Sequence, residues 1–204
     1  MKIIVANTSH FKYAQVICNT IADSATVRGT GIAKRTPEYI QKKLENGNAV
    51  IALDGETFAG FCYIEVWGHD KYVANSGLIV HPDYRGKGLA KSIKQKVFEL
   101  SQEKFPGAKI FGITTGLPVM KINYELGYKP VTFSELTDDP EFWKGCQTCK
   151  NFDVLTRTEQ KMCLCTGMLY DPATQTNKDK KVNGKAFKRL KSIKEQLFLK
   201  KNKK

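Results

Sequence analysis

The segment 80–90, which reads VHPDYRGKGLA, constrains the fold of this chain more than any other stretch. The apolar run 72–80 leads into it, and a helix with Leu89, Ile93 and Val97 along one side follows at once. Glycines in such a turn let the backbone approach a ligand closely, and the unpaired N–H groups of the first helical turn point at the same place. The sequence therefore predicts a strand, a phosphate-binding turn and a helix in direct succession.

The glycine spacing argues against a dinucleotide site. Gly86 and Gly88 are followed by Lys91, where the G-x-G-x-x-G pattern requires a third glycine. Taken alone, the RGKG sequence is equally compatible with an ordinary basic surface turn.

Apolar periodicity predicts the order β-α-α-β-β-β-α-β-α, followed by further strands. The expected strands are 3–5, 49–53, 58–67, 72–80 and 108–114, and the expected helices lie around 14–21, from Pro37, after Gly88 and over 118–126. Thr36 is expected to cap the second helix, and Gly47 lies just past its end. This order predicts a mixed sheet with helices on both faces.

The strand 58–67 is apolar on both sides, which is typical of the interior of a covered sheet. The strict alternation of a strand predicts two faces, one with Phe58, Cys62, Ile64 and Val66 and the other with Ala59, Phe61, Tyr63 and Trp67.

The turn resembles the pyrophosphate motif of the GNAT (N-acetyltransferase) superfamily, R/Q-x-x-G-x-G/A. Arg85, Gly88 and Ala90 occupy its three defining positions, and the element order from residue 3 to about residue 134 is similar to that fold. The resemblance implies an α/β (α+β) fold with a mixed, mostly antiparallel sheet. It also implies an enzyme that transfers an acetyl or similar acyl group from acetyl-CoA or another acyl-CoA to an amine.

The resemblance further implies where coenzyme A binds. A V-shaped opening is expected between the strand that ends at Val80 and the strand 108–114, with the pantetheine arm in the gap. The pyrophosphate would be bound by the main chain of Gly86, Lys87, Gly88, Leu89 and Ala90. Pantetheine would pair with Leu78, Ile79 and Val80 as a missing strand would. An N–H near Val80 would stabilise the oxyanion.

The proton donor is left unassigned. Many GNAT enzymes place a tyrosine four residues before the glycine of an LGF-like element. Here Asn123 occupies that position before Gly127, and Tyr124 lies one residue along, about 100° around a helix. We include Asn123 among the residues expected to contact coenzyme A. The usual asparagine earlier in the motif is replaced by Gly116.

Glu65 is the first candidate for the catalytic base. It lies near the end of a largely apolar strand, where burial would raise the pKa of its carboxyl group; the alternative is a solvated carboxylate. His69 and His81 titrate in a useful range, although His81 precedes Pro82 and is as easily structural. Cys62 is expected to be a small core residue rather than an acyl carrier.

Four cysteines form two close pairs, Cys146 with Cys149 and Cys163 with Cys165, separated by thirteen residues. Two such turns across a hairpin can supply the four ligands of a structural zinc ion, the alternative being four reduced thiols. We expect the metal to clamp strands over 152–155 and 162–169 beside the acceptor pocket. The insert looks like that of a GNAT subgroup associated with arginine-biosynthesis gene clusters, which favours an amino-acid acceptor such as glutamate.

Charge is concentrated at the C-terminal end. Residues 171–204 contain 12 of the 33 Lys and Arg and 3 of the 20 Asp and Glu residues, a net charge of +9, which leaves +4 for residues 1–170. An apolar helical face with Phe187, Leu190, Ile193 and Leu197 predicts docking on the chain's own domain or on a second subunit, as in a homodimer; the sharper alternative is a nucleic-acid arm.

No apolar run approaches the roughly 20 residues of a membrane span. The N-terminal sequence also becomes polar too early for a signal peptide, so we expect a cytoplasmic protein without a membrane partner.

We therefore predict a GNAT core over 1–140, a four-cysteine zinc hairpin over 141–172 that completes the sheet, and a basic tail with an amphipathic helix over 173–204. The predicted function is N-acylation of a small amine or amino acid. A protein or peptide acceptor, or a CoA-sensing module that binds nucleic acid, are the alternatives.

Overall fold

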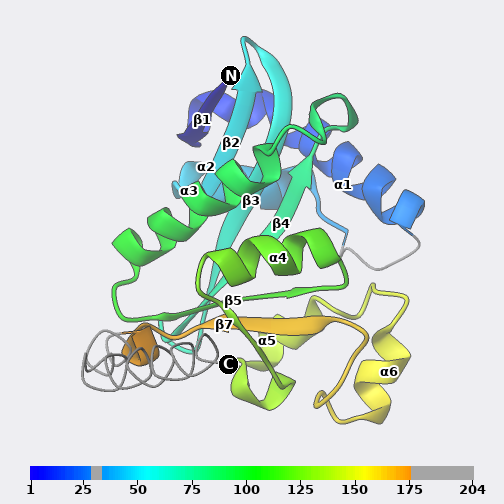
Figure 1. Cartoon of the computed structure of the whole chain (residues 1–204). Helices are drawn as coiled ribbons and strands as arrows, with labels where there is room; N and C mark the ends of the chain where they lie inside the picture. The colour runs from blue at the N-terminus through cyan, green and yellow to red at the C-terminus, as the bar shows by residue number, and fades with distance from the viewer. Residues whose placement is uncertain (29–33, 176–204) are drawn as a thin grey trace, which may run out of the picture. The chain divides into compact units, whose positions relative to one another are not determined.

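The computed structural model describes residues 1–28 and 34–175 (Figure 1). The element order predicted for residues 3–126 is confirmed. The strands are β1 (Lys2–Val5), β2 (Ala49–Asp54), β3 (Thr57–Trp67), β4 (Tyr72–Val80), β5 (Lys109–Thr114), β6 (Lys129–Val131) and β7 (Thr166–Tyr170). The helices are α1 (Ala14–Arg28), α2 (Pro37–Glu45), α3 (Leu89–Lys104), α4 (Leu117–Glu125), α5 (Pro140–Lys144) and α6 (Phe152–Arg157). Three short 3-10 turns are η1 (Thr8–Tyr13), η2 (Pro82–Tyr84) and η3 (Phe133–Glu135).

In the described ranges the strands form one seven-stranded sheet in the order β1-β2-β3-β4-β5-β7-β6. The pair β4–β5 is parallel and the other five pairs are antiparallel. The predicted mixed, mostly antiparallel sheet is therefore confirmed. The parallel pair is possible because the long connection through α3 returns the chain to the same end of the sheet.

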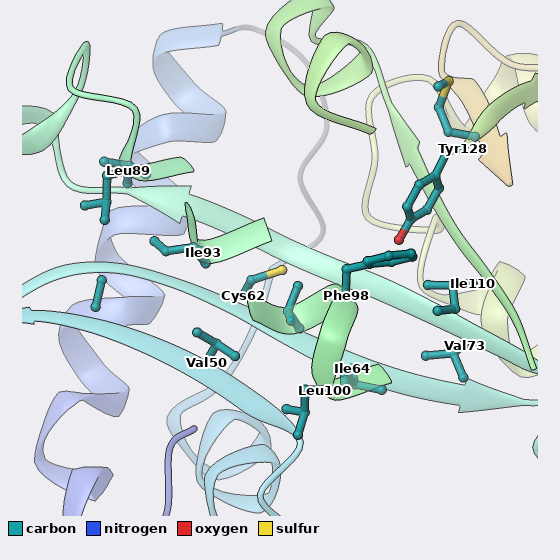
Figure 2. Close-up of a cluster of buried hydrophobic side chains, with 14 of the residues drawn as sticks. Val50, Cys62, Ile64, Val73, Leu89, Ile93, Phe98, Leu100, Ile110 and Tyr128 are labelled. Carbon is teal, nitrogen blue, oxygen red and sulfur yellow. The ribbon is translucent and has the colours of Figure 1, made fainter. Parts of the chain in front are cut away.

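Helices cover both faces of this sheet. On one face, α3 places Ile93, Val97 and Phe98 against β3 and β4 in a buried cluster that includes Cys62 and Tyr128 (Figure 2). On the other face, α1 and α2 pack against β2 and β3, and their inner residues are Ile17, Ile21, Ile40 and Leu44. The two clusters bury both surfaces of β3, as its composition predicts.

The N-terminus of α2 is built as expected. The side chain of Thr36 accepts a hydrogen bond from the Tyr39 N–H at 3.3 Å, and Pro37 occupies the first turn. Beyond the helix, Gly47 adopts a left-handed conformation with φ of +60°. The start of α2 is thereby fixed beside the C-terminal end of β3, where several candidate residues lie.

A β-bulge in β3 changes two of the predicted side-chain directions. Leu53 pairs with Phe58 but Ala52 pairs with Gly60, so Ala59 is one extra residue opposite β2. Phe58 consequently packs with the α1–α2 cluster and Ala59 with the α3 cluster. The strict alternation predicted for Phe58 and Ala59 is therefore wrong, while Cys62 and Ile64 share the α3 face as expected.

The predicted strand over 152–155 is also wrong, because these residues begin helix α6. Phe152 and Leu155 are three residues apart, so both reach one side of a helix, and Leu155 is fully buried. The last strand, β7, starts only at Thr166, and the apolar residues Met162 and Leu164 before it are 66% and 67% exposed. Only β7 of this region joins the sheet, between β5 and β6.

The chain divides into two compact units, 1–170 and 171–204. In the second unit the structure describes residues 171–175, where the Asp171 carboxylate accepts a hydrogen bond from the Ala173 N–H at 2.9 Å. The predicted amphipathic helix with Phe187 and Leu197 lies outside the described residues. Among the helices that are described, none has the length and apolar character needed to cross a membrane.

Candidate active site

Strands β4 and β5 separate along their length, as the predicted opening requires. Their parallel pairing joins Tyr72–Ala74 to Lys109–Phe111 and is not continued beyond Ala74 and Phe111. A cavity of about 510 Å³ lies at the gap, lined by Asn75–Leu78 on one side and Gly112–Thr115 on the other. Tyr39 of α2 and Lys94 of α3 also line the cavity. Because these helices cover opposite faces, the cavity passes through the sheet.

The edge of β4 directs main-chain groups into this gap. The His81 N–H donates to the Ala59 carbonyl at 2.9 Å, so His81 and Ile79 face β3. Alternate residues face opposite edges, and the N–H groups of Leu78 and Val80 therefore point into the gap. The main chain of Ile79, in contrast, is turned toward β3. The oxyanion role of Val80 and the pairing of Leu78, Ile79 and Val80 with pantetheine stay predictions.

A second bulge, in β4, shapes the same edge. Phe61 pairs with Ile79 but Tyr63 pairs with Ser76, so one extra residue of β4 lies opposite Cys62. Gly77 makes this possible with φ of +64°, and a Cβ atom there would lie 2.3 Å from Cε1 of Tyr63. The bulge separates the paired part of β4 from the part that faces the cavity.

The turn before α3 presents its main chain. Gly86 and Gly88 both have φ of +77°, and Gly88 caps α3 without a side-chain hydrogen bond. A Cβ atom at either glycine would have no neighbour within 4 Å among the described residues. The first N–H groups of the helix, at Leu89 and Ala90, have no intrahelical acceptor, and together with the helix dipole they favour an anion. Lys87 lies in the same turn.

Arg85 is turned away from this main chain. Its Nε donates to the Val80 carbonyl at 3.1 Å and its Nη2 donates to Ser24 Oγ at 3.0 Å. The guanidinium therefore ties the end of β4 to α1. Its predicted contact with coenzyme A stays a prediction.

Glu65 lies at the α2 side of the cavity and is only 12% exposed, so it is not a solvated carboxylate. It accepts a hydrogen bond from the Tyr39 hydroxyl, and Lys43 Nζ lies 3.9 Å from its Oε1 atom. Burial, followed by the charges of Tyr63 and Glu65, raises the pKa of Tyr39 well above its usual value, so Tyr39 remains a donor. Burial lowers the pKa of Lys43.

Arg35 lies beside this carboxylate. Its Nε donates to the Tyr63 hydroxyl at 2.6 Å, and its guanidinium lies 5.2 Å from the Tyr39 ring centroid. In the described part of the chain no carboxylate lies within ion-pair distance of Arg35. Lys34 and Arg35 both line the cavity, as do the carboxylates Glu65 and Glu141.

Asn123 and Tyr124 point to different sides of α4, as their helical spacing predicts. Tyr124 is 70% exposed and does not line the cavity, whereas Asn123 lines it and is 1% exposed. The Oδ1 atom of Asn123 is buried without a hydrogen-bond partner among the described residues. A buried carbonyl oxygen left in this way is expected to accept a hydrogen bond from a ligand or water.

The other catalytic candidates are outside the cavity. His69 lies in the β3–β4 turn, and His81 lies 3.6 Å from Asp83 through its Nδ1 atom; neither lines the cavity. The Cys62 thiol donates to the Ser76 carbonyl at 3.3 Å, and burial raises its pKa to about 11. Cys62 is a protonated core residue, as expected.

Sequence reasoning missed a buried lysine. Lys94 lines the cavity from α3, and its Nζ donates to Asn75 Oδ1 at 3.0 Å. The Tyr128 hydroxyl donates to the same oxygen at 3.0 Å. The helical pattern contained the clue, because a lysine that directly follows Ile93 and precedes Val97 by three residues lies toward the inner face of α3.

The four cysteines line the α5–α6 side of the cavity. Burial, together with the charges of Cys149 and Cys163, raises the pKa of Cys146 to about 11. Burial and the charges of Cys163, Cys149 and Cys146 raise the pKa of Cys165 to about 12. The four thiols are therefore neighbours. In the described ranges, however, no group of three or more His, Cys, Asp or Glu side chains is arranged to hold a metal ion.

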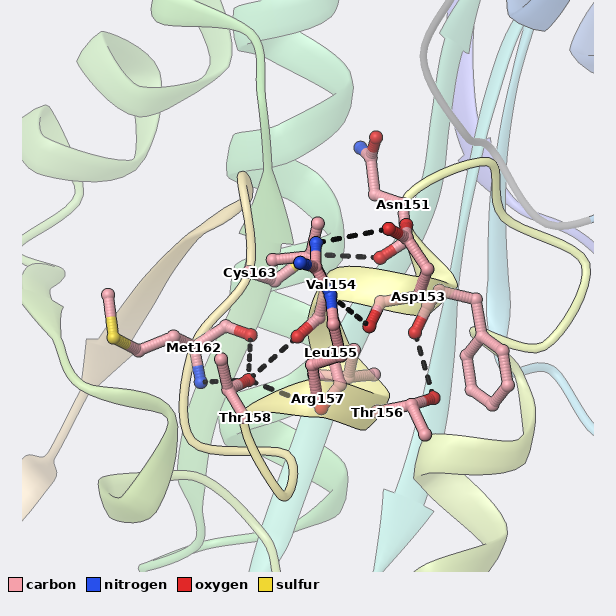
Figure 3. Close-up of polar contacts among 10 residues, drawn as sticks. Asn151, Asp153, Val154, Leu155, Thr156, Arg157, Thr158, Met162 and Cys163 are labelled. Carbon is pink, nitrogen blue, oxygen red and sulfur yellow. Dashed lines mark hydrogen bonds and ion pairs between the residues drawn. The ribbon is translucent and has the colours of Figure 1, made fainter.

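The segment between the two cysteine pairs is held by its own hydrogen bonds (Figure 3). The Thr158 hydroxyl interacts with the carbonyls of Val154, at 2.9 Å, and of Met162, at 2.7 Å, and accepts from the Met162 N–H at 3.2 Å. The Cys163 thiol points to the Asn151 carbonyl at 4.0 Å. These contacts connect the second cysteine pair to α6 without a metal.

The site combines a glycine turn at the start of a helix with two parallel strands that separate around a cavity. These features define a class of proteins that can bind a phosphate-bearing carrier and hold its arm between the strands. A model described as the acetyltransferase (GNAT) family matches residues 18–120, just over half of the chain. The chain belongs to this family and is a GNAT-type acetyltransferase. The predicted superfamily is confirmed, and the four-cysteine subgroup stays a prediction.

Solved structures share the fold at low sequence identity. Rv2747 from Mycobacterium tuberculosis, in complex with CoA and NLQ, is 13% identical with a TM-score of 0.59, over 84% of this chain and 99% of that one. N-acetylglutamate synthase from Neisseria gonorrhoeae, complexed with coenzyme A and N-acetyl-glutamate, is 11% identical with a TM-score of 0.59, over 83% of this chain but 34% of that one.

Diaminobutyrate acetyltransferase EctA from Paenibacillus lautus, in complex with L-2,4-diaminobutyric acid and coenzyme A, is 10% identical with a TM-score of 0.56, over 84% of this chain and 94% of that one. A search of the curated proteins finds no significant match. At these identities the structures establish the fold alone.

Proposed function

We propose that this chain transfers an acetyl group from acetyl-CoA to the amine of a small molecule that carries a carboxylate, such as a free amino acid. One observation carries the proposal: a cavity passes through the sheet where β4 and β5 separate, and both Arg35 and Glu65 line it. At the other end of the same edge, β4 leads into the glycine turn of residues 86–88. The thioester would then meet the amine within the gap.

The main chain would do most of the donor binding. Amides of the turn and of the first turn of α3 would hold the pyrophosphate, and the N–H groups of Leu78 and Val80 would pair with the arm. Asn123 has an acceptor oxygen to offer to an N–H of the arm. Because these contacts use atoms that every residue has, the donor site depends on backbone shape more than on side chains.

Glu65 would remove the proton from the acceptor's ammonium group, directly or through a water molecule. Its carboxylate lies inside the cavity and has one hydroxyl donor and one ammonium group beside it. Tyr39 and Lys43 would hold the carboxylate in place. A neutral amine is then produced next to the thioester carbon, which is the requirement for attack.

Arg35 supports a carboxylate on the acceptor. The planar guanidinium of Arg35 lines the cavity, forms no ion pair within 4.0 Å among the described residues, and is suited to bidentate recognition of a carboxylate. Two structurally similar proteins are complexed with amino acids or their derivatives, an N-acetylglutamate synthase with N-acetyl-glutamate and a diaminobutyrate acetyltransferase with L-2,4-diaminobutyric acid, which is consistent with such an acceptor.

The test is a panel of matched amines assayed with acetyl-CoA by thiol release. Each amino acid is compared with its carboxamide, which keeps the amine and removes the negative charge. We expect the amino acid to be preferred by about tenfold or more in kcat/KM, since a charge-assisted hydrogen bond contributes about 1.5–3 kcal/mol. Arg35→Gln should remove this preference.

Two results would contradict the proposal in different ways. Equal rates with the amino acid and its carboxamide would show that the acceptor needs no carboxylate. Turnover only with peptide amines would favour the protein or peptide alternative. If calorimetry shows no binding of coenzyme A to the full chain, the donor assignment itself is wrong.

A structural zinc ion at Cys146, Cys149, Cys163 and Cys165 is a second, separate proposal. Its support is the chemistry of four neighbouring soft ligands from two short turns. Because no three of the described candidate ligands are arranged to hold an ion, the thiols would have to move closer on binding. Elemental analysis of the purified protein should give about one zinc per chain, lost in Cys146→Ser; a metal-free, folded protein would support four reduced thiols.

A further inference from the structure

Lys94 is an ammonium group inside the core. It is 2% exposed, and its neighbours along α3, Ile93 and Val97, are fully buried in the same apolar cluster. A methionine or leucine would fill this position without the free-energy cost of removing a charge from water. A lysine at this position therefore indicates that its proton or its charge has a function.

The surroundings of Lys94 contain no opposite charge. Its Nζ donates to Asn75 Oδ1, and the Asn75 Nδ2 in turn donates to Ser101 Oγ at 2.8 Å. The titratable groups that face it are the Cys62 thiol of β3 and the Tyr128 hydroxyl, whose ring centroid lies 4.9 Å from Nζ. No carboxylate forms an ion pair with Lys94 within residues 1–28 and 34–175. The remaining neighbour is the cavity, which Lys94 helps to line.

Burial in this apolar site lowers the pKa of Lys94 from 10.5 to about 8. The usual pKa of a thiol is about 8.5. A proton donor works best when its pKa lies near both the operating pH and the pKa of the group that it protonates. Lys94 is therefore matched to a departing thiolate, and it would still be charged at neutral pH.

The expected path of the donor brings its sulfur atom to this lysine. The pyrophosphate would lie at the turn beyond Val80, and the arm would run back along the free edge of β4. About twelve bonds separate the phosphate oxygen from the sulfur, which at three backbone bonds and about 3.4 Å per residue corresponds to about 14 Å, or four strand residues. Counting four residues back from Val80 reaches Ser76, which adjoins Asn75, the hydrogen-bond partner of Lys94. On this path the thioester oxygen lies near Ser76, so the Val80 N–H would pair with the part of the arm nearer the pyrophosphate and not with the oxyanion.

We propose that Lys94 is the general acid of the acetyl transfer, positioned by Asn75 to protonate the sulfur of coenzyme A as it leaves. This inference rests on the proposed function. The amine nitrogen forms a bond to the thioester carbon and the carbon–sulfur bond breaks, its electron pair passing to sulfur. A proton moves from Lys94 Nζ to that sulfur, giving the free thiol and a neutral amine on Lys94. The proton released from the acceptor nitrogen leaves through Glu65 or water, and Lys94 regains a proton from solvent.

The experiment compares three single variants of the full chain. Lys94→Met fits the apolar site and removes the proton, Lys94→Gln keeps a hydrogen-bond donor to Asn75 without an acid, and Lys96→Met makes the same change on the exposed side of α3. We expect kcat to fall about 10²-fold in both Lys94 variants and to be unchanged in Lys96→Met. Calorimetry should show coenzyme A binding in all three.

The pH profile distinguishes proton donation from packing. In the wild-type protein kcat should decline above about pH 8, as Lys94 loses its proton, and this alkaline decline should be absent from both Lys94 variants. If the wild-type protein acetylates an amine and Lys94→Met has the same kcat, or keeps the alkaline decline, the proposed role of Lys94 is wrong. The proposed function would still stand. A wild-type protein that neither binds coenzyme A nor acetylates any amine would overturn the proposed function first.

Discussion

Gly88 combines a left-handed backbone with open space around its Cα atom. The open space is where we expect the pyrophosphate, so Gly88→Glu would place a side chain and a negative charge at that point. We predict that this variant folds, at a cost of about 1–2 kcal/mol for the left-handed conformation, and loses coenzyme A affinity by at least about 10²-fold. Isothermal titration calorimetry provides the measurement.

Gly107→Glu is the matched control for this variant. Gly107 also has a positive φ, of +85°, and open space around it, but it follows the far end of α3. The sixteen residues of α3 span about 24 Å. Equal losses of affinity in the two variants would show that the effect comes from strain and not from the binding turn.

Lys94 also predicts how stability changes with pH. Its pKa is about 8 in the folded protein, against the 10.5 of an unperturbed lysine, so between these values the unfolded chain binds a proton that the folded chain does not. The free energy of unfolding therefore rises with pH in this window. The rise should be about 2–3 kcal/mol between about pH 7 and about pH 10.

Other groups titrate in the same range, so the prediction concerns a difference between two proteins. Urea unfolding of wild-type and Lys94→Met should show that the variant is more stable near pH 7 and that its advantage shrinks toward pH 10. A difference that does not depend on pH would mean that Lys94 has an ordinary pKa in the folded state.

The bulge in β4 separates the part of the strand that pairs with its neighbours from the part that faces the cavity. It depends on Gly77, where a Cβ atom would meet the Tyr63 ring and the backbone has a positive φ. We predict that Gly77→Ala lowers the free energy of unfolding by about 2–4 kcal/mol, from left-handed strain and overpacking together. It should also weaken coenzyme A binding, because the Leu78 N–H would be redirected.

Gly55→Ala separates these two contributions. Gly55 has a similar φ, of +59°, but a Cβ atom there would have no neighbour within 4 Å in the described structure. Chemical denaturation should show a loss of only about 1–2 kcal/mol for this control. If Gly77→Ala costs no more than Gly55→Ala, the Tyr63 ring moves aside and the bulge is not fixed by this contact.

The elements themselves could be predicted from sequence where local rules decide. The strand 72–80 has the predicted bounds, and α2 begins at its Thr36 cap, because both depend on periodicity and capping within a few residues. The bulges at Ala59 and Gly77 could not be predicted, since each adjusts one strand to its neighbour. The helix α6 was missed because its few apolar residues fit a short strand equally well.

In the candidate site, too, features set by local sequence could be predicted and features set by distant elements could not. The glycine turn and the separation of β4 from β5 were expected from a contiguous motif, and Asn123 from its spacing to Gly127. The pairing of Glu65 with Tyr39 and Lys43, the position of Arg35 and the burial of Lys94 come from elements far apart in sequence. A sequence shows only that a charged residue is present. Whether its side chain faces water or a cavity depends on the fold.

The protein as a whole has two regions of different charge. Residues 1–170 are only mildly basic, whereas 171–204 have a net charge of +9. The nucleic-acid arm and the homodimer both depend on residues beyond those described, and they stay predictions, as does a cytoplasmic location. The sheet and the described lining of the cavity lie within residues 1–170.

A ligand that completes the sheet should stabilise this entire unit. The unpaired edges of β4 and β5 leave a gap at its centre, and an arm that pairs with β4 would close it. At a coenzyme A concentration of about 100 times its Kd, binding contributes about 2.7 kcal/mol to the free energy of unfolding. For a protein of this size that corresponds to a rise in Tm of about 5–10 °C.

Differential scanning fluorimetry of wild-type and Gly88→Glu with increasing coenzyme A tests this coupling. The Tm of the wild-type protein should rise with ligand concentration, and the Tm of the variant should not. Because closing the gap stabilises both halves of the sheet, the melting transition should stay single as it moves. Two transitions, with only one responding to ligand, would show that the halves on either side of the gap unfold separately and that the arm does not bridge them.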